Sequence, residues 1–96
     1  MITHIVLFKL KDTSAESIRK AQEKLLSMNG RVDMLRHLEV GLDVVRSARS
    51  YDIALFTKFD SLDDLQAYQV HPYHGGDVAP YMREASEAVV VVDYES

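Results

Sequence analysis

The sequence predicts an α+β fold of the ferredoxin-like type, in which helices cover one face of a four-stranded antiparallel sheet. Three observations predict this fold. The chain has 96 residues, the usual size of one domain, so residues 1–96 are expected to form a single domain. Strand-like and helix-like hydrophobic patterns follow each other in the order β-α-β-β-α-β, with one extra short helix before the last strand. Two βαβ-like halves in a short chain are typical of this arrangement.

The first half of the chain predicts a strand, a helix and a second strand. Residues 2–10 are rich in β-branched and aromatic side chains, which is typical of a strand. The face of this strand that we expect to meet the helices carries His4, Val6, Phe8 and Leu10. A helix capped at Thr13 or Ser14 follows, and Asn29-Gly30 ends it because both residues tolerate a positive φ. Alternation over residues 38–44 predicts a second strand with one exposed face.

The second half predicts a hairpin partner, two helices and a last strand. Residues 51–59 alternate as a strand after a polar turn. Ser61 is a candidate N-cap for the next helix, which Pro72 ends at or before His71. A short helix is expected over residues 77–85, and the valine run at 89–92 predicts a buried strand.

Composition narrows the function classes. The net charge is −4 with acids and bases interspersed, which argues against a nucleic-acid partner. The sequence has neither a leader nor an apolar run long enough to span a membrane, so no membrane partner and a cytoplasmic location are expected. The absence of cysteine excludes disulfides and thiolate chemistry.

The first and last strands are apolar on both faces, which helices on one side of the sheet cannot explain. Ile5 and Leu7 lie opposite the helix-facing residues, and residues 89–92 are apolar throughout. An uncovered apolar sheet face is rare in soluble monomers. The pattern therefore favours a homodimer packed sheet to sheet over the alternative, in which the outward residues only reflect β-propensity.

The segment from Tyr68 to Gly76 is the candidate functional region. It contains His71, Tyr73 and His74 around a proline, side chains that exchange protons near neutral pH. A pocket between sheet and helices is expected to include them together with His4, Phe8 and Leu25. In a catalytic interpretation, an imidazole accepts a proton and a tyrosine hydroxyl stabilises the developing oxyanion. In a structural one, the histidines cap helix carbonyls. The spacing of His71 and His74 suggests a metal site only weakly, because Pro72 interrupts the helix, and no metal is expected.

Three stretches of the chain resemble the stress-responsive dimeric α/β-barrel (Dabb) family. They are residues 4–11, the His-Pro-Tyr-His motif at 71–74 and the closing residues 91–94. The resemblance implies a homodimer whose two sheets form a barrel. The family includes a plant polyketide cyclase that makes olivetolic acid, in which a histidine is the general base and a tyrosine assists it. These two residues correspond to His74 and Tyr68, and a pocket histidine corresponds to His4. A further pocket tyrosine on the first helix has no counterpart at residues 23–27.

Three hypotheses of function follow. The first is a stress-responsive-type dimer that binds a small apolar or aromatic molecule. The second is a cofactor-independent cyclase, isomerase or lyase acting on a carbonyl compound, with His74 and Tyr68 as catalytic residues. The third is a monooxygenase that handles heme or oxygen, with His74 as axial ligand. The sequence contains no dinucleotide or phosphate-binding motif, and no organic cofactor is expected.

Overall fold

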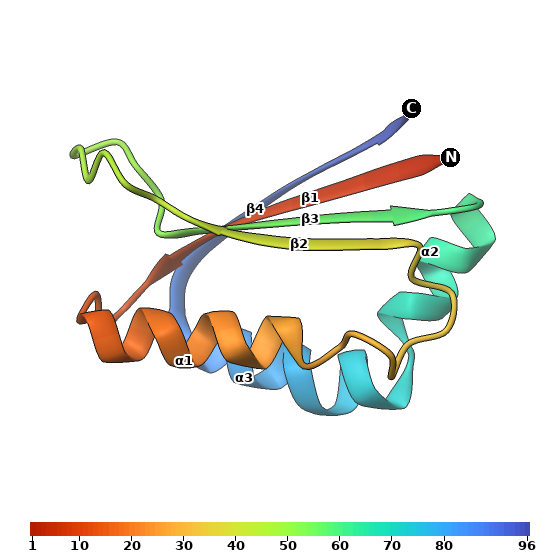
Figure 1. The fold of residues 1–96 in the computed structure, drawn as a ribbon, viewed down its shortest axis with the longest axis horizontal. Coiled ribbons are helices and arrows are strands. Elements are labelled where there is room, and N and C mark those ends of the chain that lie inside the picture. Colours follow the sequence, from red (N-terminus) through yellow and green to blue (C-terminus); the bar gives the residue numbers. More distant parts are fainter.

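All helices lie on one side of a four-stranded antiparallel sheet in the computed structural model, which describes residues 1–96 (Figure 1). The strands are β1 (Ile2–Leu10), β2 (His37–Leu42), β3 (Ile53–Phe59) and β4 (Ser86–Glu95), arranged in the order β2-β3-β1-β4. The helices are α1 (Ala15–Leu26), α2 (Leu62–Gln69), the π-helical turn η1 (His74–Val78) and α3 (Ala79–Ala85). The ferredoxin-like fold predicted from the sequence is confirmed.

Helices α1 and α2 begin at the serines that the sequence predicts as caps, but α1 ends at Leu26, before the expected stop at Asn29-Gly30. The Ser14 side chain accepts a hydrogen bond from the Ser17 amide, and the Ser61 side chain accepts one from the Asp64 amide. Each serine therefore satisfies a free donor in the first turn. Helix α2 ends at Gln69, before Pro72, as expected. None of the helices is long and apolar enough to cross a bilayer.

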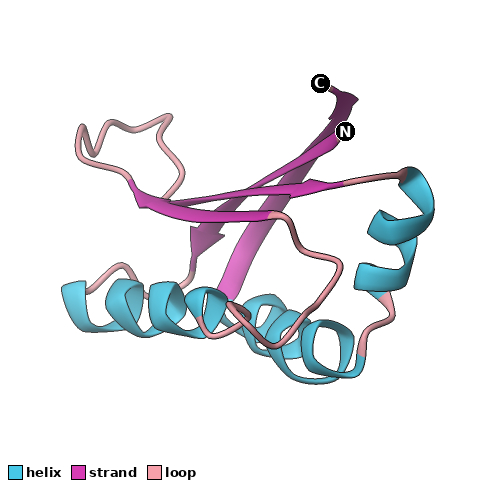
Figure 2. Ribbon diagram, turned by 45° about the vertical axis from the view of Figure 1, so that its right-hand side comes forward, coloured by secondary structure: helices cyan, strands magenta, loops and turns pink.

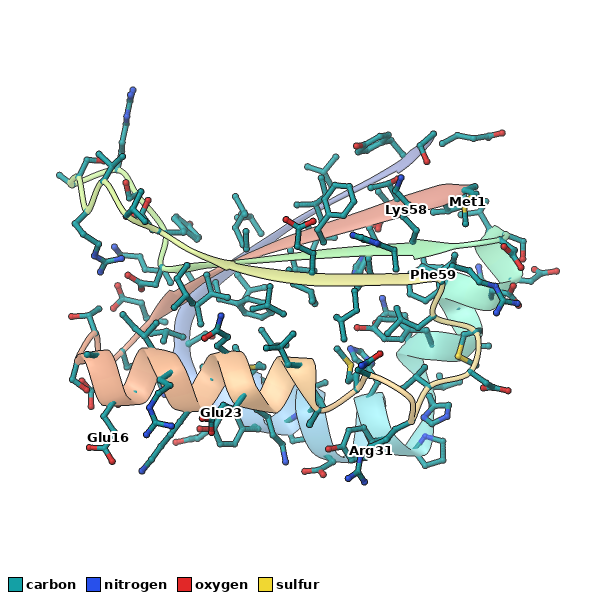
Figure 3. All side chains as sticks on the ribbon, viewed as in Figure 1. Met1, Glu16, Glu23, Arg31, Lys58 and Phe59 are labelled. Carbon is teal, nitrogen blue, oxygen red and sulfur yellow. The ribbon has the colours of Figure 1, made fainter.

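The central strand β1 pairs along its length with β3 on one side and β4 on the other, which places the two termini side by side (Figure 1). Its helix-facing side chains are buried, as predicted from alternation, and pack in a core with those of β3, α1 and α3. Figure 3 shows the same alternation on β3, where Phe59 points toward the helix layer and Lys58 lies on the other side of the sheet.

The last strand differs most from its prediction. It runs over Ser86–Glu95 instead of 89–92 because its antiparallel pairing continues almost to both ends of β1. The expectation that residues 89–92 are buried is wrong, since these four valines are between 45% and 60% exposed. Val89 and Val91 are exposed because β4 lies at the edge of the sheet, where the helices cover its inner face incompletely (Figure 2). Val90 and Val92 are exposed because they lie on the opposite face, beside Leu7 and Ile5.

Two other boundaries differ from the sequence predictions. Strand β2 ends at Leu42 and β3 begins at Ile53, so the hairpin loop is longer than predicted. Inside this loop the buried carboxylate of Asp52 accepts the Leu10 amide at 2.7 Å and the Arg46 guanidinium at 2.7 Å. These bonds tie the loop to β1. The expected helix at 77–85 is preceded by a π-helical turn that begins at His74, so the two form one continuous helical segment.

No element of the chain covers the sheet face opposite the helices (Figure 2). Pairing puts Leu7 beside Val90 and Ile5 beside Val92 on this face. Leu7, Val90 and Val92 are all at least 36% exposed. The apolar outer face predicted from the sequence is therefore present.

Candidate ligand-binding site

A cavity of about 350 Å³ lies between the sheet and the helices. Strands β1, β3 and β4 form one wall, and α1, the end of α2, η1 and α3 form the other. Apolar side chains make up most of the lining, namely Val6, Phe8, Leu25, Leu55, Val78, Ala79, Met82, Val89 and Val91. The polar lining residues are His4, Gln69, His74, Arg83 and Asp93. The volume lies in the range of small-molecule pockets, and the lining has their usual composition of apolar walls with a few polar groups.

The buried ring of His4 is paired with a carboxylate inside this cavity. Its Nδ1 lies against Oδ1 of Asp93, the residue directly opposite it on β4. When Nδ1 carries the proton and donates a hydrogen bond to Asp93, Nε2 is left as the acceptor nitrogen. The carboxylate therefore selects the tautomer and the orientation of His4.

The ring of His74 stacks on the ring of Tyr68, with centroids 3.9 Å apart and planes inclined by 31°. Its Nδ1 is buried and has no hydrogen-bond partner, which is uncommon for a buried nitrogen and suggests a functional reason for its position. Burial lowers the pKa of the His74 imidazole below its ordinary value of 6.5. The backbone carbonyls of Gln69 and Tyr68 lie near the ring and oppose this shift, although neither meets hydrogen-bond geometry, and the neighbouring His4 adds to the shift. The ring is therefore neutral at pH 7 and able to accept a proton.

Tyr68 lies behind His74 and does not line the cavity. It is completely buried, and its hydroxyl donates to Sδ of Met28 at 3.6 Å. Its ring also packs edge-on against the His4 ring, with centroids 6.0 Å apart, so Tyr68 joins the two histidines into one aromatic cluster. Burial raises the pKa of the Tyr68 hydroxyl, which remains protonated. In this position Tyr68 orients His74, which differs from the oxyanion partner expected from the sequence.

Two of the expected substrate-binding residues point elsewhere. His71 uses Nδ1 to accept the Tyr73 amide at 3.1 Å, so it satisfies a backbone donor and does not cap a helix carbonyl as the structural interpretation expected. The Tyr73 hydroxyl bonds Oγ of Ser27 at 2.6 Å, and Arg31 lies over its ring. Neither side chain lines the cavity, because the turn at Pro72 directs Tyr73 toward α1. The other expected lining residues, His4, Phe8 and Leu25, do line it.

Gly75 allows the close packing that positions His74. A Cβ atom at this position would lie 2.8 Å from the carbonyl oxygen of Gln69, closer than real Cβ contacts. Only glycine lets η1 pack this tightly against the end of α2. By contrast, a Cβ at Gly76 would meet nothing within 4 Å.

Sequence reasoning missed Asp93, Arg83 and Gln69 as residues of this site. Asp93 could have been found by extending the alternation of β4, since Val89, Val91 and Asp93 lie two residues apart and share one face. Arg83 and Gln69 carry no such signal, because their place depends on how the helices pack on the sheet. The structure brings no three histidine, aspartate or glutamate side chains together as a metal site.

The fold and the cavity define a ferredoxin-like α+β subunit with a ligand-sized pocket on the helix side of its sheet. The model of the stress responsive A/B barrel domain (Dabb) matches residues 2–96, so the chain belongs to this family. A Streptomyces coelicolor protein described as uncharacterized is 32% identical over 98 residues, with 99% of each chain covered. A stress-response A/B barrel domain-containing protein of Arabidopsis thaliana is 27% identical over 95 residues, but this chain spans only 36% of its length.

Solved structures show the same fold. A dimeric ferredoxin-like protein of unknown function from Bacteroides fragilis superposes with a TM-score of 0.82 and 33% identity, covering 99% of this chain and 95% of that one. A dimeric ferredoxin-like protein of unknown function from Thermobifida fusca superposes with a TM-score of 0.85 and 26% identity, and the match covers 99% of this chain and 90% of that one. A hydroxynitrile lyase from Passiflora edulis superposes with a TM-score of 0.82 and 21% identity, and the match covers 97% of this chain and 90% of that one. At this identity the likeness is one of fold alone.

The two glycines provide a matched test of how His74 is positioned. Gly75→Ala is expected to lower the free energy of unfolding by about 1–3 kcal/mol, the usual cost of a backbone or packing conflict. It should also move the His74 ring resonances in an NMR spectrum. Gly76→Ala should leave both unchanged or raise stability slightly, because alanine is the better helix former. Equal effects of the two substitutions would contradict the packing argument.

Proposed function

We propose that this protein binds a small apolar or aromatic molecule in the cavity between sheet and helices. The observation that carries the proposal is the cavity itself, about 350 Å³ with nine apolar lining residues. Val89 and Val91 remain about half exposed although they face it, so the chain alone leaves this apolar surface in contact with water. Covering such surface stabilises a complex by roughly 25 cal/mol per Å².

We further propose that two copies pair through the outer sheet face. The supporting observations are the exposed Leu7, Val90 and Val92 on that face and the description of similar solved structures as dimeric. Sheet-to-sheet packing buries such a face while leaving the helix layer, and therefore the cavity, free. Ligand binding and pairing thus use opposite sides of the same strands.

Proton transfer next to a carbonyl is a second candidate function. One observation favours it: two histidines border the same end of the cavity in different surroundings. His4 is held by a carboxylate, whereas His74 is neutral and has a buried nitrogen without a partner. Groups whose environments differ in this way are typical of acid–base pairs. In this candidate His74 is the base, and Tyr68 holds its ring in place.

Ligand binding is tested by filling the cavity. Ala79 lines it, so Ala79→Phe should occupy its volume and weaken the binding of small aromatic compounds at least tenfold, measured by calorimetry with naphthalene derivatives. Ala67→Phe is the matched control, because Ala67 is exposed on α2 and away from the cavity. Unchanged affinity in a correctly folded Ala79→Phe protein would contradict the proposed site.

Pairing is tested with a charge on the outer face. Val90→Asp should convert the dimer into a monomer in analytical ultracentrifugation, because an unpaired buried charge costs about 3–5 kcal/mol. Leu62→Asp places the same charge at another exposed apolar residue, in the first turn of α2 where an acid is favourable, and should leave the dimer intact. A stable monomer of the unsubstituted chain would refute the proposal.

Proton transfer is tested by deuterium exchange next to the carbonyl of phenylacetone in D₂O. If the protein catalyses it, His74→Ala should slow the exchange by about 10²–10⁴-fold, the usual contribution of a general base. The rate should rise with pH and reach half of its plateau below pH 6.5, since only the neutral ring accepts a proton and its pKa is lowered. His71→Ala, which changes a histidine outside the cavity, should leave the rate unchanged. A destabilised but fully active His74→Ala protein would end this candidate.

A further inference from the structure

We propose that the ligand carries a carboxylate at one end and that Arg83 binds it. This inference rests on the proposed ligand-binding function and names the chemical class of the ligand, an apolar acid. Its basis is the position of one uncompensated cation at the border of an apolar cavity.

Arg83 is the lining residue that carries this charge. It lies in the last turn of α3, is exposed, and borders the cavity together with Val89 and Met82. It forms no ion pair, although Glu84 and Glu87 are close in sequence. A guanidinium without a counter-ion offers two parallel N–H donors, the geometry that a carboxylate accepts.

Asp93 is the acid among the lining residues, and it does not compensate Arg83. Its carboxylate is engaged by His4 at the other end of the strand pair. Asp93 lies four residues beyond Val89 on β4, which corresponds to about 13 Å along a strand. The cavity therefore has a cationic end at Arg83 and a histidine end at His4, with apolar walls between them.

The shape of the ligand follows from this arrangement. Phe8, Val6 and Leu55 occupy the stretch of sheet between the two ends, so they contact an alkyl or aromatic body. One uncompensated cation suits one singly charged group, which favours a carboxylate over a phosphate dianion. An aryl-alkanoic or medium-chain acid meets both requirements.

The test compares acids with their uncharged amides. Calorimetry with 4-phenylbutyrate and 4-phenylbutanamide, and with octanoate and octanamide, should show each acid binding about tenfold more tightly than its amide, in keeping with one charge-assisted contact at an exposed arginine. Arg83→Gln should abolish this preference and leave amide binding unchanged. Arg31→Gln is the matched control, because Arg31 is an arginine over the Tyr73 ring and outside the cavity.

The outcomes distinguish failure of carboxylate recognition by Arg83 from failure of apolar-ligand binding. Amides that bind in the cavity as tightly as the acids, or an acid preference that survives Arg83→Gln, would overturn the carboxylate inference alone. Failure of all four compounds to bind would overturn both this inference and the proposed apolar-ligand function.

Discussion

The alternation of side chains on two paired strands, β1 and β4, is the constraint on which the other features depend. Because β1 is hydrogen-bonded on both sides, its successive residues must point to opposite faces of the sheet. His4 therefore faces the helices and Leu7 faces outward. The same register gives β4 an inner row that lines the cavity and an outer row on the bare face. One pair of strands thus separates a surface for a ligand from a surface for a second copy of the chain.

On the helix side, close packing places a polar cluster at one end of an apolar cavity. The absence of a Cβ at Gly75 brings η1 against the Gln69 carbonyl, and His74 then lies over the buried Tyr68 ring. Tyr68 in turn contacts His4, which Asp93 holds from β4. The cluster therefore links α2, η1 and both strands. A histidine kept neutral by burial and a histidine held by a carboxylate are suited to binding a polar end group as well as to moving a proton.

Local patterns in the sequence predict the sheet, the caps and the place of His4, because strand alternation and serine caps act over a few residues. They do not predict the His4–Asp93 pair, which depends on the register of strands 89 residues apart in sequence. Nor do they predict which way a side chain leaves a helix: Tyr68 turns its hydroxyl to Met28 and Tyr73 turns to Ser27. The family resemblance identified the segment that contains His74, but the tertiary packing determines which of its side chains reach the cavity.

The four consecutive valines of β4 provide the most direct test of this account. Methyl NMR spectra of valine-labelled protein would be recorded with and without 4-phenylbutyrate, at constant protein concentration. Shifts are expected at Val89 and Val91, which line the cavity, and none at Val90 and Val92, which lie on the outer face. Shifts confined to Val90 and Val92 would contradict it, because they would place the ligand on the face assigned to pairing.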